Sequence, residues 1–123
     1  MSQDQPMADR LDGLFASIDA RDTEAFIGHL TEDAVFRFGS APALRGREAI
    51  RDGVNAFFAS IAGSRHSLIN VLGDSDTLVC EGEVSYRRHD DTEVTLPFTN
   101  VFELDGSLIS RYKIYIDINP LYA

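Results

Sequence analysis

The sequence has a single cysteine, Cys80, among its 123 residues. One cysteine excludes an internal disulfide and a cysteine-rich zinc site. Cys80 lies in an apolar stretch, so we expect a small core residue rather than a nucleophile. Basic residues are also few, because 11 Lys and Arg against 20 Asp and Glu give a formal charge of −9. That charge repels phosphate backbones, which makes nucleic acids and anionic membranes poor partners.

Several familiar signatures are missing as well. No apolar run approaches the ~20 residues needed to span a bilayer. The start of the chain, MSQDQPMADR, lacks the basic and apolar parts of a secretory signal, so a cytoplasmic location is the default expectation. No two histidines stand at metal-ligand spacing, and no phosphate loop or nucleotide fingerprint occurs. We therefore expect neither a metal nor a cofactor.

The first half of the chain has helical periodicity. Apolar residues recur at three- and four-residue spacing from about Met7 to Ala20 and again from Arg47 to Ala62, with Gly63 as the predicted helix stop. A short helix is predicted to begin near Asp22, a favourable N-cap. Between these helices, DAVFRFG is typical of a short strand and SAPALRG of a loop.

After Gly63 the apolar period changes from 3.6 to 2. Four strand-like segments follow, over residues 64–73, 77–89, 93–104 and 107–118, joined by short turns that include Asp105-Gly106. This pattern predicts one α+β domain over residues 1–123, with three helices packed in a curved mixed or antiparallel sheet. Long strands curl with their twist, so we expect a cone whose mouth binds small molecules. The convex face is apolar too, which predicts a homodimer through it.

Three segments, HLTEDAVFRF, LRGREAIRDGVNAFF and DGSLISRYKIYID, resemble the SnoaL-like polyketide cyclase group of the nuclear transport factor 2-like superfamily. The resemblance extends over nearly the whole chain and implies the cone-shaped fold. It does not specify a reaction, because this fold hosts isomerases, cyclases, dehydratases, epoxide hydrolases and non-catalytic binders.

No member of the superfamily is reproduced intact. Ketosteroid isomerases have their aspartate base where this chain has Phe38, although Asn100 matches their second oxyanion donor. Limonene epoxide hydrolases share only the aspartate that resembles Asp117. Scytalone dehydratase matches at His66 and resembles this chain at Asn100, but its second histidine corresponds to Gly82 here.

The last strand supplies the main candidate, Asp117. Alternation in RYKIYID puts Tyr112, Ile114 and Ile116 on one face and Arg111, Lys113, Tyr115 and Asp117 on the other. The polar face lies either in solvent or on a pocket wall. The resemblance favours the pocket, since it implies that Asp117 projects into the cavity as an acid/base group. Tyr115 then becomes a ligand-binding candidate on the same wall.

Five further residues complete the predicted site. His66 is an acid/base partner for Asp117 or, alternatively, a hydrogen-bonded structural histidine. Asn100 stabilises a developing oxyanion or is a paired buried amide. Glu81 faces the ligand or the outside of the sheet, and Phe58 and Phe98 line the cavity.

These residues predict a small-molecule-binding protein. Its possible activity is cofactor-independent acid/base catalysis of the cyclase, isomerase or dehydratase type on a hydrophobic oxygenated substrate. The alternative is a non-catalytic binding or accessory module that keeps the same cavity.

Overall fold

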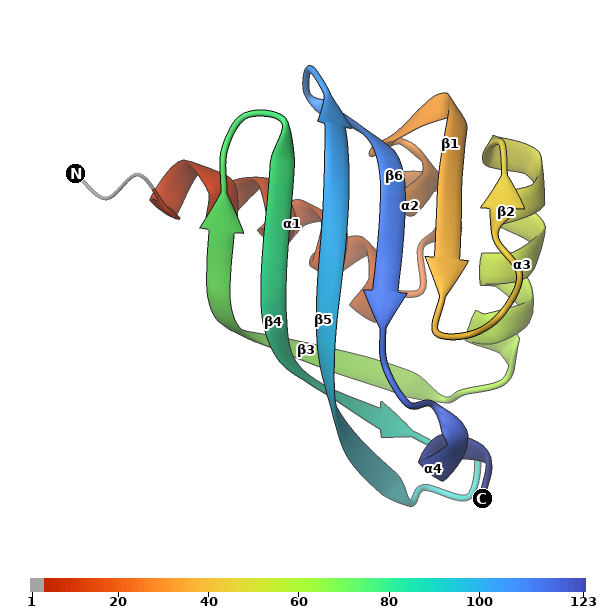
Figure 1. Ribbon diagram of the computed structural model, residues 1–123. Helices are drawn as coiled ribbons and strands as arrows, with labels where there is room; N and C mark the ends of the chain where they lie inside the picture. The colour runs from red at the N-terminus through yellow and green to blue at the C-terminus, as the bar shows by residue number, and fades with distance from the viewer. Residues whose placement is uncertain (1–3) are drawn as a thin grey trace.

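The computed structural model describes residues 4–123, and its helices lie against one face of a curved sheet (Figure 1). The helices are α1 (Asp4–Asp19), α2 (Thr23–Ile27), α3 (Arg47–Ala59) and α4 (Asn119–Tyr122). The first three were predicted, whereas α4 was not. The third helix also ends earlier than predicted, and Gly63 begins a strand instead of capping it. Ser60 closes α3 by donating its hydroxyl to the Phe57 carbonyl.

The sheet has six strands in the order β2-β1-β6-β5-β4-β3. They are β1 (Leu30–Phe38), β2 (Leu44–Arg45), β3 (Gly63–Gly73), β4 (Thr77–Arg87), β5 (Glu93–Asp105) and β6 (Leu108–Tyr115). The last four form the predicted antiparallel meander, and β1 pairs in parallel with β6. Part of the predicted loop after β1 forms the short strand β2. The predicted α+β fold with a mixed sheet is confirmed.

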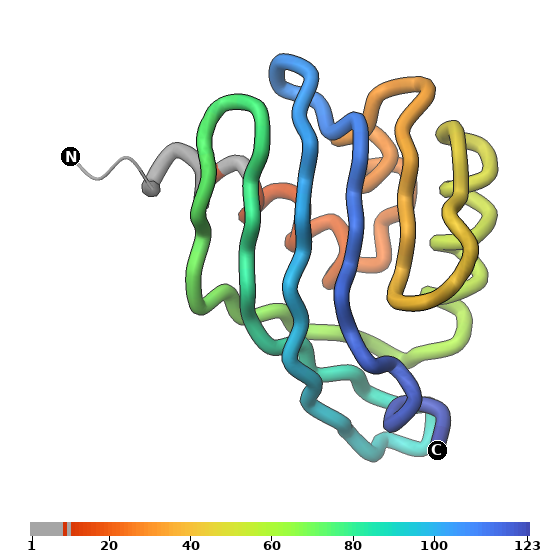
Figure 2. The backbone as a smooth tube through the Cα atoms, viewed as in Figure 1, coloured from red at the N-terminus to blue at the C-terminus, as the bar shows by residue number. Residues whose placement is uncertain are grey.

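Strand β3 contains an irregularity that contributes to the curvature of the sheet. The pairing of β3 with β4 shifts register between Leu68 and Asn70, which is the mark of a β-bulge. Opposite the bulge, a Cβ added to Gly82 would lie 2.1 Å from the Ser67 carbonyl oxygen, so only glycine permits this close approach. Figure 2 shows that β3 bends near its middle, and β4 bends with it, since the two strands are paired on both sides of the bulge.

Apolar side chains from the helices and the concave sheet face make one core. Its largest fully buried members are Tyr112, Phe26 and Phe102. No helix within residues 4–123 is long and apolar enough to cross a membrane.

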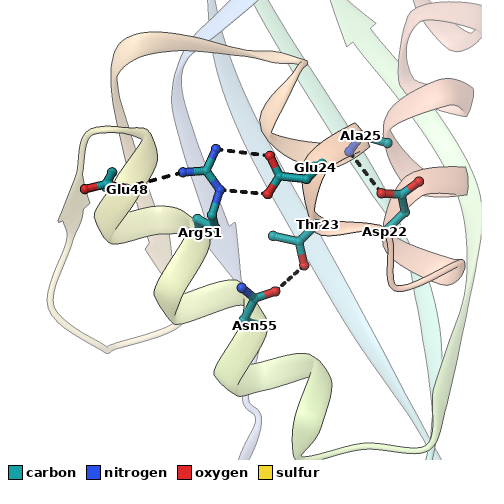
Figure 3. Close-up of polar contacts among 7 residues, drawn as sticks. All are labelled: Asp22, Thr23, Glu24, Ala25, Glu48, Arg51 and Asn55. Carbon is teal, nitrogen blue, oxygen red and sulfur yellow. Dashed lines mark hydrogen bonds and ion pairs between the residues drawn. The ribbon is translucent and has the colours of Figure 1, made fainter.

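Polar contacts at the surface join α2 to α3 (Figure 3). Asp22 caps α2 by accepting a hydrogen bond from the backbone nitrogen of Ala25 at 3.1 Å. One Arg51 nitrogen lies 2.7 Å from the Glu24 carboxylate, and the Thr23 hydroxyl donates to the Asn55 amide oxygen. These contacts hold together the two helices that cover the β1 side of the sheet.

Candidate functional site

A cavity of about 230 Å³ lies between the concave face of the sheet and the helices. Its walls are mostly apolar and aromatic, and they include both predicted phenylalanines, Phe58 and Phe98. The polar side chains that line it are few: His66, Tyr86, Asn100 and Tyr112. A largely apolar cavity with a few polar groups is the usual form of a small-molecule site.

His66 forms a close pair with Asp19, the last residue of α1. The Nδ1 atom of the His66 ring lies 2.6 Å from Asp19 Oδ1, and the His66 backbone N–H donates to Asp19 Oδ2 at 3.0 Å. The Ser64 hydroxyl also donates to Asp19 Oδ1, at 2.9 Å. Two successive inward positions of β3 therefore bind one carboxylate, which fixes the helix end to the strand.

The His66 side chain is only 9% exposed and packs against two phenylalanine rings. Its ring centroid is 4.9 Å from that of Phe15 and 5.5 Å from that of Phe98. Because Asp19 accepts at Nδ1, the neutral ring carries its proton on that atom, and this assignment follows from the hydrogen-bond network. The other nitrogen, Nε2, has no hydrogen-bond partner among the described residues, and the His66 side chain is one of those that line the cavity.

The carboxylate of Asp19 is held in its charged form. Burial by itself raises the pKa of Asp19, but hydrogen bonds from the His66 ring, the His66 backbone and Ser64 outweigh burial, and the net pKa is lowered. A charged Asp19 orients the imidazole through this hydrogen bond. This arrangement is suited to general acid/base chemistry.

Asp19 was missed by the sequence reasoning. A carboxylate in the last turn of a helix opposes the helix dipole, which makes the position unfavourable without a compensating partner. Asp19 also stands four residues after Phe15, so it shares the buried stripe of α1. These two features together are the signal in the sequence.

Asn100 lies at the centre of the cavity wall on β5 and is 2% exposed. Its Nδ2 atom donates to the Tyr112 hydroxyl at 3.5 Å. Burial raises the pKa of the Cys80 thiol to about 12, an effect opposed by hydrogen bonds from the Asn100 backbone and side chain. The amide oxygen of Asn100 has no partner among the described residues.

Three predicted site residues lie outside this cavity. Asp117 is exposed, and its carboxylate accepts a hydrogen bond from the Asn119 N–H at the start of α4. Tyr115 is 56% exposed, and Glu81 is exposed and accepts a hydrogen bond from Asn70. All three border an open depression on the outer face of the sheet. The prediction that Asp117 and Tyr115 line the concave cavity is therefore wrong.

The reason is the alternation in β6. Tyr112 and Ile114 fill the inner face, as their burial requires, and Ile116 continues the same side. Arg111, Lys113 and Tyr115 consequently point outward, and Asp117 follows them after the strand has ended. The solvent-facing interpretation of RYKIYID holds. Among the side chains that the structure describes, no group of three His, Cys, Asp or Glu is placed to hold a metal ion.

Comparison with solved structures places the fold in the nuclear transport factor 2-like class. A protein of that class from Burkholderia pseudomallei K96243 has a TM-score of 0.83 at 13% identity, over 98% of this chain and 95% of that one. TerC, co-crystallised with polyporic acid, has a TM-score of 0.81 at 16% identity over 96% of both chains. An epoxide hydrolase from M. tuberculosis has a TM-score of 0.77 at 15% identity, over 93% and 84%.

The family follows from the sequence itself. The model of the SnoaL-like domain matches residues 11–112, so the chain belongs to the SnoaL-like family. The predicted resemblance is thereby confirmed. No curated protein matches the chain.

Proposed function

We propose that the protein binds a small hydrophobic, oxygenated molecule in the cavity and that His66 exchanges a proton with it without a cofactor. The observation that carries the proposal is the Asp19–His66 pair, because His66 lines an apolar cavity while its Nδ1 atom is bound to Asp19. Cyclisation, isomerisation and dehydration all begin or end with such a proton transfer. The ligand of TerC and the activity of the mycobacterial epoxide hydrolase support a small-molecule role for this fold.

Each part of the site has a separate task in this proposal. His66 Nε2 takes a proton from a carbon or oxygen atom of the substrate. Asp19 is a positioning residue, since it fixes the tautomer and orientation of the ring and stabilises the imidazolium. The aromatic walls exclude water, which strengthens the electrostatic interaction between Asp19 and His66.

A probe reaction tests the base directly without knowledge of the natural substrate. The small aromatic compound 5-nitrobenzisoxazole loses its C3 proton to a base, its N–O bond breaks, and a coloured cyanophenolate is released. We expect the wild-type protein to accelerate this reaction. His66→Gln removes the base but keeps a donor for Asp19, so the rate should fall by about 100-fold or more. Asp19→Asn should lower kcat with little change in KM.

The matched control is Asp117→Asn, which changes a carboxylate on the outer face. It should turn over the probe at the wild-type rate. A His66→Gln protein that binds and converts the probe as fast as the wild type would disprove the role of His66. A rate loss confined to Asp117→Asn would instead restore the sequence-based prediction.

A non-catalytic binding module is the second candidate. It is favoured by the position of Asp117, because one of the two predicted catalytic residues lies outside the cavity and no carboxylate lines it within the described residues. In that case the wild-type protein should bind 5-nitrobenzisoxazole without accelerating its breakdown. Saturable binding with a rate equal to that in buffer identifies this outcome.

The assembly and the location of the protein stay predictions. The outer face exposes the apolar side chains Ile69, Leu72 and Tyr115. We propose that a second copy of the chain covers them in a homodimer. A single-copy mass by light scattering would contradict the dimer. The cytoplasmic location is a proposal that rests on the sequence alone.

A further inference from the structure

Asn100 lines the cavity, and its amide oxygen is a buried acceptor. It pairs with Cys80 on β4 and Ile114 on β6, so its backbone is held in the middle of the sheet. The amide nitrogen donates to the Tyr112 hydroxyl at 3.5 Å. The amide oxygen is left as the one buried side-chain N or O atom without a partner among the described residues.

A buried acceptor without a donor is costly, and such groups are rare in folded proteins. Tyr112 beside it has one hydrogen still to donate, because its oxygen is the acceptor in the bond from Asn100. Burial raises the pKa of Tyr112 well above its usual value, so this hydrogen is retained at neutral pH. The pair therefore offers one free acceptor and one free donor side by side.

We propose that Asn100 and Tyr112 form a subsite for a hydroxyl group of the ligand. The ligand hydroxyl donates its hydrogen to Asn100 Oδ1 and accepts the Tyr112 hydrogen at its oxygen. This inference rests on the proposed function, since it deepens the same cavity. It changes the predicted role of Asn100 from a donor for an oxyanion to an acceptor for a neutral hydroxyl.

The subsite is separate from the proton-transfer group. His66 pairs with Val84 and Asn100 with Cys80, and these partners stand four residues apart on β4, on the two sides of Gly82. A hydroxyl bound at Asn100 is therefore recognised rather than transformed. The fitting ligand class is a hydroxylated aromatic or polycyclic compound that carries its reacting atom at the other end.

Three two-ring probes test the subsite on the full chain: 2-naphthol, 2-methoxynaphthalene and naphthalene. Only 2-naphthol can donate to Asn100 Oδ1. An ether or a bare ring displaces any water at that position without replacing its hydrogen bond. We expect the wild-type protein to bind 2-naphthol about tenfold more tightly than 2-methoxynaphthalene, as measured by calorimetry.

Asn100→Leu keeps the branched shape and the number of heavy atoms, and it removes the acceptor. It should bind 2-naphthol and 2-methoxynaphthalene equally and retain its affinity for naphthalene. Tyr112→Phe is the second, more conservative variant and should reduce the preference for 2-naphthol in part. Either variant alone keeps the test informative if the other fails to fold.

The outcomes separate the inference from the proposed function. Equal binding of the three probes by the wild type overturns the hydroxyl subsite and leaves the small-molecule function standing. A preference for 2-naphthol that survives Asn100→Leu and disappears in His66→Leu also overturns it, because the hydroxyl is then bound at His66. Failure of all three probes to bind contradicts the proposed function itself, and the inference falls with it.

Discussion

The inner and outer faces of β4, β5 and β6 differ in how many polar residues they carry and in how deeply those residues are buried. The outer face has many, including Glu81, Glu83 and Lys113, and its glutamates are exposed. The inner face has few, and Asn100 and Tyr112 are almost completely buried. Outer charges are solvated and bind weakly to one another, as in the 3.4 Å pair of Arg111 with Glu103. The buried polar groups of the inner face must find their hydrogen-bond partners in the protein or in a ligand.

A high density of charged residues on a sheet face is therefore a poor guide to a functional site. A carboxylate on the outer face keeps its contact with water. The Asp19–His66 pair is short, largely shielded and adjacent to an apolar cavity, so a proton transfer there has a defined geometry. Scarce and buried polar groups mark the functional face of this sheet.

The largest contrast between the two faces should appear in stability. Phe102 is fully buried on the inner face, and its ring centroid lies 4.5 Å from that of Tyr112. Phe102→Ala should lower the free energy of unfolding by about 3–5 kcal/mol, because it leaves a void in the core. Tyr115→Ala on the outer face should change it by no more than about 0.5 kcal/mol. Urea unfolding of both variants checks this, and equal losses would contradict the assignment of the two faces.

A smaller effect is expected from Asp19, and it depends on pH. Asp19→Asn should cost about 1–2 kcal/mol at neutral pH, since it weakens the charged hydrogen bonds to His66 and Ser64. The pKa of Asp19 in the folded protein lies below the ordinary aspartate value of 3.8, so the carboxylate stabilises the fold above that pH. Its contribution is lost as the pH falls through the folded pKa.

The stability difference between the wild type and Asp19→Asn should therefore shrink on the acid side of pH 3.8. Urea midpoints measured across that range give the comparison. Asp117→Asn is the outer-face control and should show no comparable neutral-pH penalty. A difference for Asp19→Asn that is the same at every pH would show that the carboxylate is not held charged by its partners.

Most of the fold could be predicted from the sequence because periodicity reports burial directly. The apolar stripes gave the three helices, and the change to period two at Gly63 gave the meander. The end of α3 and the presence of α4 were harder to predict. Ser60 closes α3 through its side chain, and α4 forms where Asp117 accepts a hydrogen bond from the Asn119 N–H. Such local hydrogen bonds leave no periodic signal.

The site was harder to predict. The alternation of side chains along a strand separates the two faces of the sheet, but it does not say which face the helices cover. In RYKIYID the helices cover the apolar face. The resemblance to cyclases had favoured the polar face as the pocket wall. His66, Asn100, Phe58 and Phe98 were found because their strands and helix were correctly placed. Asp19 was not found, because its partner stands 47 residues away and only the fold brings α1 beside β3.

The most direct test of the account is the protonation of the two His66 nitrogens. Long-range proton–nitrogen NMR spectra of the protein at neutral pH distinguish them, and His66→Gln identifies the signals among those of the three histidines. The account predicts a proton on Nδ1, a bare Nε2, and a shift of Nε2 when 5-nitrobenzisoxazole is added. A proton on Nε2, or an Nε2 signal that does not shift at a saturating concentration of the probe, would contradict the proposed role of His66.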